Sequence, residues 1–582
     1  IDAWQTSDPS LRDDDSESAL IFSPSGFTLT QSLLSNPPPL VINDPITHQT
    51  AGTDFPVHIS AYGQTDTDPL CGVIEAYTGD KSLAFWFDYN NPGSGTLSPT
   101  IDSIGISSNE GGASTQIVTF TNGQASVTAK YKDVGEIQLH TKDDTIEGST
   151  NQFVVKPATI VITDIKTNSG VNNPAANSAT GDRFVAAGEA FNTIVEVRDA
   201  EGSRTPNFGN ESTPEGIELI ASSLVIPASG RNGSANNGFI ENNSAFSAVS
   251  PPGTFSGNQF SWDEYGIIKL QASISDDDYL GAGEVTGPES GHVGRFYPAS
   301  YSLQSSTVAA ACNSFTYMDQ PDLAISYNLE AHGTASNKLF NYDQVLLGST
   351  GVSNPTLAVE NNNQGVNLNG RLVVGTPNWI NGGYSYSTLS ATFSRASALD
   401  GPFASLSVGL SVNDSLDGRT INAQDMNAGT ATNCTAVGDC NAKSLSGITQ
   451  MFYGRMTVSN AFGPETRALD IQMNASYFDG SDFIVNTADN CTTYINSSAT
   501  LSNYQDGLPA VTVMSPTTIV SLQSGQTLQT NPLLISAPGA PNTGSVDLTF
   551  DAPAWLEFNW LGTGNIDPTG TASFGHFRGH DK

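Results

Sequence analysis

Three consecutive carboxylates, Asp276, Asp277 and Asp278, are the residues of this sequence best suited to bind a cation. They follow Ser275 in a stretch typical of a loop, and carboxylate oxygens are the hard ligands that Ca²⁺ prefers. The ligand spacing of an EF-hand is missing, and the alternative is a solvated acidic loop. Calcium is therefore the one candidate cofactor. A second acidic run, Asp13 to Asp15, lies in a polar segment and is the weaker candidate.

Motifs for the common enzyme chemistries are missing from the sequence. Neither a G-x-S-x-G elbow nor a P-loop occurs, and Gly281-Ala282-Gly283 lacks the dinucleotide-binding spacing. His576 and His580 are four residues apart, which suits zinc on a helix, but on a strand they would lie about 13 Å apart. Acidic residues are too numerous to single out a glycosidase pair. The sequence thus predicts no enzyme and no catalytic residue.

The five cysteines form no C-x-x-C pair and no zinc-finger spacing with histidine. Cys434 and Cys440 are close in sequence, and this proximity predicts a disulfide that closes a small loop. So few cysteines in a chain rich in Ser, Thr and Asn fit an oxidising compartment. The odd count leaves one thiol free or paired outside this segment.

Alternating apolar and polar residues predict β-strands along the whole chain. The clearest case is 117–131, where apolar residues occupy alternate positions on both sides of Asn122-Gly123. Asn-Gly readily adopts the positive φ values of a type I′ turn, so this segment is predicted to form a β-hairpin. The predicted fold class is all-β, with tandem immunoglobulin-like β-sandwich domains followed by a larger C-terminal β domain.

Two stretches of the chain match without a gap. Residues 131–139 (YKDVGEIQL) and 262–270 (WDEYGIIKL) share the pattern aromatic-x-x-apolar-Gly-x-Ile-x-Leu. In each copy we expect the aromatic residue to fill the core, Gly to permit a tight turn, and Ile and Leu to face inward. A repeat of this length predicts tandem sandwiches.

These patterns divide the chain into four regions. Residues 1–50, which include Pro37-Pro38-Pro39, are expected to form an extended linker or edge segment. Two immunoglobulin-like sandwiches are predicted at 51–157 and 158–297, and a C-terminal β domain at 298–582. A Gly/Asn/Cys-rich loop at 426–446 is expected to separate two sub-sheets of that last domain.

The net charge of the 582-residue chain is −36, from 58 acidic and 22 basic residues. Such a surface repels nucleic acid and anionic lipid, which excludes both as partners. No run of about 18 apolar residues occurs, so no membrane-spanning segment is expected. The chain starts without Met and stops without a terminator, so it is expected to be a fragment of a longer protein whose signal peptide, if any, has been removed.

Several segments, strongest over 295–582, resemble the MshQ-type proteins, which are associated with the mannose-sensitive haemagglutinin (MSHA) type IV pilus. The segments occur in the family's order and are 294–298 (GRFYP), 312–321 (CNSFTYMDQP), 400–403 (DGPF), 455–463 (RMTVSNAFG), 486–491 (NTADNC) and 574–581 (FGHFRGHD). Cys312 and Cys491 lie in these motifs and remain once Cys434 and Cys440 are paired, so a second disulfide is expected between them. Cys71 is then unpaired or joined to a part outside this segment.

The resemblance implies an extracellular, pilus-associated adhesion or stalk protein on the bacterial cell surface, with no catalytic residues to carry over. The expected partners are pilus or other surface components, and a glycan or surface ligand. Two alternatives stay open, a polysaccharide-active enzyme or its accessory module, and a structural filament subunit.

Overall fold

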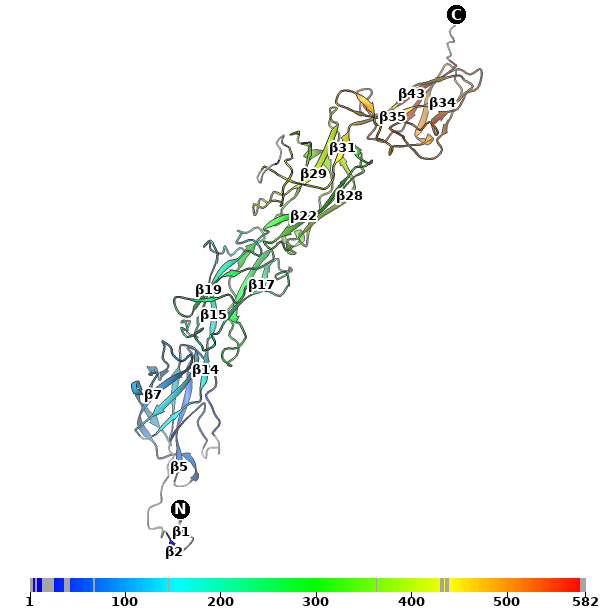
Figure 1. Ribbon diagram of the computed structural model, residues 1–582. Coiled ribbons are helices and arrows are strands. Elements are labelled where there is room, and N and C mark those ends of the chain that lie inside the picture. Colours follow the sequence, from blue (N-terminus) through cyan, green and yellow to red (C-terminus); the bar gives the residue numbers. More distant parts are fainter. Residues whose placement is uncertain are drawn as a thin grey trace. The chain divides into compact units, whose positions relative to one another are not determined.

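The computed structural model describes residues 4–5, 8–12, 26–35, 42–65, 68–144, 146–362, 364–429, 434 and 439–575. Strands account for 46% of the chain and helices for 2%, which confirms the all-β prediction. The short helices are η1 (Glu110–Gly112), α1 (Gln344–Leu347), η2 (Asn369–Arg371) and η3 (Asn496–Ser498). Figure 1 shows this succession of β-sheets along the chain, which divides into two units, 1–296 and 297–582.

The first sandwich of unit 1 consists of two six-stranded sheets, and apolar residues alternate toward the space between them. One sheet contains β4 (Gln49–Thr50), β7 (Gly79–Asn91), β10 (Ser114–Phe120), β12 (Gly135–Lys142), β13 (Glu147–Ser149) and β14 (Phe153–Lys156). The other contains β3 (Gly26–Thr30), β5 (Phe55–Thr65), β6 (Asp68–Val73), β8 (Thr100–Ile101), β9 (Ile104–Gly105) and β11 (Gln124–Lys130). Two strands from within 1–50, β3 and β4, thus belong to this sandwich, whereas β1 (Trp4–Gln5) pairs only with β2 (Asp8–Arg12).

The predicted hairpin at 117–131 is wrong in its pairing, although its turn is correct. Asn122 and Gly123 have φ values of 48° and 78°, and Thr121 and Gln124 exchange two backbone hydrogen bonds across them. Beyond that bridge β10 pairs with β7, and β11 pairs with β5 in the opposite sheet. The turn therefore connects the two layers of the sandwich, because each strand buries its apolar face more fully by joining its own sheet.

The second sandwich of unit 1 repeats the pattern with fewer strands. One sheet contains β15 (Thr159–Thr167), β16 (Phe191–Arg198), β18 (Ser247–Val249) and β19 (Thr254–Phe260), and the other contains β17 (Ile217–Ile226), β20 (Gly266–Ile274) and β21 (Val293–Phe296).

The repeated motif has the same structure in both sandwiches of unit 1. Tyr131 and Trp262 are fully buried, and a positive-φ glycine starts the strand that follows in each copy. A Cβ on Gly135 would lie 2.6 Å from the Asn91 carbonyl oxygen, and a Cβ on Gly266 would lie 2.2 Å from that of Ile226. Any larger residue would clash with the neighbouring strand, which explains glycine at this place.

In unit 2, the strands of the first pair of sheets lie between residues 300 and 452. One sheet contains β22 (Ser300–Ala309), β24 (Leu323–His332), β26 (Leu372–Val373), β27 (Trp379–Ile380) and β28 (Gly383–Phe393). The other contains β23 (Phe315–Tyr317), β25 (Thr356–Asn361), β29 (Phe403–Ser411), β30 (Lys443–Ser444) and β31 (Thr449–Phe452). Since β30 pairs with β29, the 426–446 loop returns to the sheet that it leaves, and the passage to the next sheets lies at 453 instead.

The C-terminal sheets of unit 2 are smaller and surround one apolar core. They contain β32 (Gly454–Val458), β35 (Met473–Phe478) and β36 (Phe483–Val485); β33 (Ala461–Gly463), β38 (Ala499–Gln505), β42 (Gly544–Phe550) and β43 (Thr569–Phe574); β34 (Leu469–Ile471), β39 (Val513–Ser515) and β41 (Leu533–Ile535); and β37 (Thr493–Tyr494) with β40 (Val520–Ser521).

Candidate functional sites

The predicted calcium residues lie in the turn after β20, where Asp276 and Asp278 accept hydrogen bonds within the loop. Asp278 accepts backbone hydrogen bonds from Gly281 (3.0 Å) and Gly283 (2.7 Å), so both of its carboxylate oxygens already bond within the loop. The Asp276 carboxylate accepts a long hydrogen bond, 3.4 Å, from the Asp278 amide. No group of three or more His, Cys, Asp or Glu side chains in the described residues is placed to hold a metal ion. Calcium binding here remains a prediction for chelation to test.

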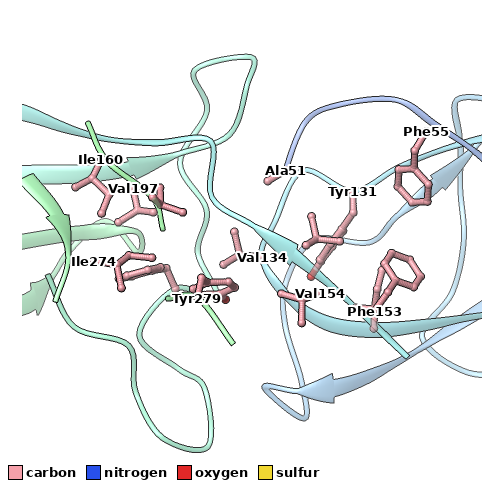
Figure 2. Packing of buried hydrophobic residues seen from close by; sticks show 14 of the residues in the cluster. Ala51, Phe55, Tyr131, Val134, Phe153, Val154, Ile160, Val197, Ile274 and Tyr279 are labelled. Atoms are coloured by element: carbon pink, nitrogen blue, oxygen red, sulfur yellow. The ribbon is translucent and has the colours of Figure 1, made fainter. Parts of the chain in front are cut away.

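A continuous apolar core joins the two sandwiches of unit 1. Ala51 and Val134 at the end of the first sandwich belong to the same buried cluster as Val197, Ile274 and Tyr279 of the second. Figure 2 shows these side chains at the junction, with Val134 and Tyr279 facing the same space. Burial of apolar area across a junction stabilises one arrangement of the two domains. The joint is therefore packed like a core rather than connected by a free linker.

A loop of the second sandwich inserts Asn207 into the end of the first. The Asn207 backbone amide donates to Asp133 Oδ1 at 2.9 Å, and its side chain donates to the Tyr131 hydroxyl (3.1 Å) and to the Val134 carbonyl (3.3 Å). Outside the buried contact, Glu201 bonds with both Lys130 and Lys132, which lowers the pKa of Glu201 to about 2. The motif at 131–135 therefore also forms the docking surface for the next domain.

Acidic side chains gather at this joint of unit 1. Asp133 is fully buried and its Oδ2 atom has no hydrogen-bond partner. The pKa of Asp133 is raised to about 6, mainly by burial and in part by the charge of nearby Glu211, while the hydrogen bonds from Asn207 and Val134 oppose this rise. Glu211 accepts a hydrogen bond of 2.7 Å from the Tyr279 hydroxyl.

Glu215 adds to this acidic group. Burial, followed by the charge of Asp276, raises the pKa of Glu215 to about 7, with smaller contributions from Glu211 and Asp278. Carboxyl groups whose pKa is raised favour protonation in the folded state, so acid is expected to strengthen the joint.

In unit 2 a disulfide connects the two sets of sheets. Cys312, before β23, is joined to Cys491, 179 residues later, with Cα atoms 5.9 Å apart. Beside it the Tyr317 hydroxyl donates to Asp489 at 3.0 Å and accepts from the Asn486 side chain at 2.9 Å. Two of the segments that carried the resemblance, 312–321 and 486–491, therefore meet at this joint.

Arg395 forms a second connection at the same joint of unit 2. Its guanidinium donates to the carbonyl oxygens of Gly454 (2.8 Å), Glu557 (3.0 Å) and Trp555, and it stacks over the Tyr453 ring at 4.6 Å. The side chain is almost completely buried, with Asp319 as its ion-pair partner at 3.6 Å. A planar fork of five donors suits such a set of carbonyls, and lysine could not reproduce it.

The remaining sequence candidates lie apart from these joints. A disulfide joins Cys434 and Cys440, and Cys71 is a free, partly exposed thiol. Asp13–Asp15, Pro37–Pro39, His576 and His580 lie outside the described residues. No helix in the described ranges is both long and apolar enough to cross a membrane.

Sequence reasoning missed Asn207 and Arg395, the two side chains whose hydrogen bonds connect neighbouring domains. Neither lies in a periodic segment, and nothing local marks a loop residue that docks on another domain. One usable signal was the acidic position shared by the two repeats, Asp133 and Glu264, since charged residues beside a core motif imply a specific buried role.

Comparison with protein-family models gives four matches in order along the chain. The model described as "Domain of unknown function (DUF6701), first Ig-like domain" matches residues 9–157, and the models of the second, third and fourth DUF6701 domains match 156–254, 264–441 and 452–582. The chain belongs to the DUF6701 family. The first and second DUF6701 domains meet at 156–157, between β14 and β15. The third domain ends at 441 and the fourth begins at 452. A search of curated protein sequences finds no significant match.

Solved structures resemble this DUF6701 chain only loosely. The crystal structure of invasin, a bacterial integrin-binding protein, aligns over 94% of this chain and 78% of its own at 10% identity, with a TM-score of 0.30. The D0–D1 domain of intimin aligns over 44% of this chain and 95% of its own at 15% identity, with a TM-score of 0.13. Domains 1–6 of the surface layer protein SbsC align over 91% and 53% at 10% identity, with a TM-score of 0.16. Scores this low assign no shared function.

Proposed function

We propose that this DUF6701 protein is an extracellular stalk or adhesion protein of the bacterial cell surface, associated with a type IV pilus as in the MshQ-type proteins that it resembles. Its partners are then pilus or other surface components, and it catalyses no reaction.

The observation that carries the proposal is the construction of the joints. In unit 1 the two sandwiches share one apolar core and are connected by the hydrogen bonds of Asn207. In unit 2 a disulfide and Arg395 connect consecutive sets of sheets. Domains fixed to their neighbours in this way transmit force and hold a binding part at a set distance, which is what a stalk requires. The buried polar groups of Asp133 and Arg395 bond with partners in the adjacent domain or set of sheets.

The surface chemistry supports an extracellular location. Disulfides persist in oxidising compartments, and two are present. The net charge of −36 keeps such a protein soluble and separate from anionic lipid. The step to a pilus comes from the ordered motifs between 294 and 581, two of which form the unit 2 joint.

The test is deletion of the gene in its native host, with attachment to surfaces and pilus display measured together. The deletion strain should attach several-fold less or display fewer pili, and the intact gene should restore both. Normal attachment and piliation, with degradation of a polysaccharide by the purified protein, would replace the proposal by the enzyme alternative. End-to-end polymers of the purified protein would favour a filament subunit instead.

A further inference from the structure

An apolar pocket with polar margins lies on the C-terminal sheets of unit 2. It has a volume of about 380 Å³, within the range of small-molecule sites. Trp560, Leu561, Ile566 and Pro568 form its apolar part. Trp560 is 39% exposed and Leu561 74% exposed, whereas Trp86, Trp262 and Trp379 are buried. An exposed tryptophan beside a pocket offers a flat apolar surface on which the apolar face of a ligand can pack.

The Trp560 ring is held in place by its neighbours. Phe558 packs edge-on against it, with ring centroids 5.1 Å apart, and the Arg455 guanidinium carbon lies 5.1 Å from its centroid. Arg455 is itself stacked 3.8 Å from the centroid of Phe483. A ring fixed before binding loses little conformational entropy when a ligand packs on it.

Oxygen atoms suited to hydroxyl groups surround the apolar part. Asp567 accepts one internal hydrogen bond, from the Ala552 amide at 2.9 Å, through Oδ1 only. The Thr569 hydroxyl pairs with that of Thr549 at 2.9 Å, and the Thr457 hydroxyl makes one long bond of 3.5 Å to the Asn474 carbonyl. Each of these three lining residues keeps capacity for further hydrogen bonds.

We propose that this pocket binds one neutral hexose unit of a polysaccharide, whose C–H face packs on Trp560 while its hydroxyls bond with Asp567 and the flanking threonines. A neutral sugar is favoured over an acidic one because the Asp567 carboxylate lines the pocket and would repel a second carboxylate. An extended peptide is disfavoured because the outer edge of β32 is already bonded, from Met456 to the Leu556 carbonyl (2.7 Å) and from Arg395 to the Gly454 carbonyl. The inference concerns the purified protein and does not rest on pilus association.

The experiment is electrophoresis of the full chain in native gels that contain dextran, mannan, galactan or a mixed-linkage β-glucan. At least one polysaccharide should retard the protein, and Trp560→Ala should weaken the apparent affinity at least tenfold. Leu561→Ser, at a more exposed position, should weaken it as well, so a folding defect of one variant cannot decide the result. Phe462→Ala removes another exposed aromatic side chain of the same domain, 71% exposed, and should leave the retardation unchanged.

No retardation in any of the four gels, or equal retardation of the wild type and Trp560→Ala, would overturn the proposal. So would selection of apolar peptides from a display library whose binding is lost in Trp560→Ala, because the pocket would then belong to a protein partner.

Discussion

Replacing Asp133 by Asn should stabilise unit 1 at pH 8 and remove the part of its pH dependence that comes from Asp133. The pKa of Asp133 rises from 3.8 to about 6 in the folded chain, mainly through burial. At about 1.36 kcal/mol per pKa unit, the ionised carboxylate costs the fold about 3 kcal/mol above pH 6. Since this folded pKa is raised, the stability is fully present below about pH 3.8 and is lost as pH rises through about 6.

Asn keeps the acceptor that the Asn207 and Val134 amides use but places a buried amide nitrogen where Oδ2 lacks a partner. Subtracting about 1 kcal/mol or more for that unpaired donor leaves a net gain of about 1 to 2 kcal/mol at pH 8 and none at pH 5.

The assay is urea unfolding of the full chain, followed by pulsed hydrogen exchange of peptides from 131–139 at one labelling pH. Asp144→Asn, at an exposed carboxylate of the same sandwich, is the matched control and should behave as the wild type at both pH values. If wild-type unit 1 is equally stable at pH 5 and pH 8, or if the Asp133→Asn variant is less stable than the wild type at pH 8, the buried Asp133 carboxylate does not destabilise the fold.

The other predictions concern the disulfides, the hydrogen bonds of Arg395 and the acidic loop. Removing the Cys312–Cys491 disulfide by double Ala substitution should lower the free energy of unfolding by roughly 5 kcal/mol, and removing Cys434–Cys440 by roughly 2 kcal/mol, because the sequence separations are 179 and 6 and the loop entropy grows with loop length. Equal losses of stability in urea titrations would contradict this prediction, and so would peptide mapping that finds other disulfide pairs. Arg395→Lys should destabilise unit 2 by about 2 kcal/mol in thermal unfolding, since lysine cannot bond with the same carbonyls. An unchanged melting temperature would mean that the Arg395 hydrogen bonds contribute nothing to the stability of unit 2. If Asp276, Asp277 and Asp278 bind calcium, EDTA should lower the melting temperature, because a cation bound only by the folded state stabilises that state. An unchanged melting temperature would leave these residues a solvated acidic loop.

The parts of the fold that follow from local periodicity could be predicted. Alternation identified the strands, and the repeat at 131–139 and 262–270 identified two equivalent core positions, because a buried aromatic and a positive-φ glycine impose strict local demands. The pairing of β10 and β11 could not be predicted. A type I′ turn fixes only the residues beside it, and the choice between one sheet and two depends on burial across the whole sandwich.

The joints were beyond sequence reasoning for a different physical reason. Asn207 and Arg395 act through contacts between residues that are 76 and 162 positions apart in the chain, so no local pattern marks them. Trp560 was also missed, because a single aromatic residue near a Gly-rich turn has no signature until the pocket beside it is known. For the Asp276 to Asp278 run, the sequence could not show that Asp278 bonds with the amides of Gly281 and Gly283, because that depends on the turn the loop adopts.

We propose that this chain acts outside the cell, on the bacterial surface. Immunogold labelling of intact native cells, with antibodies raised against residues 51–296, tests it most directly. Gold should label unpermeabilised cells, concentrated along or at the base of pili, and should be absent from the deletion strain. Label that appears only after the cells are permeabilised would contradict it.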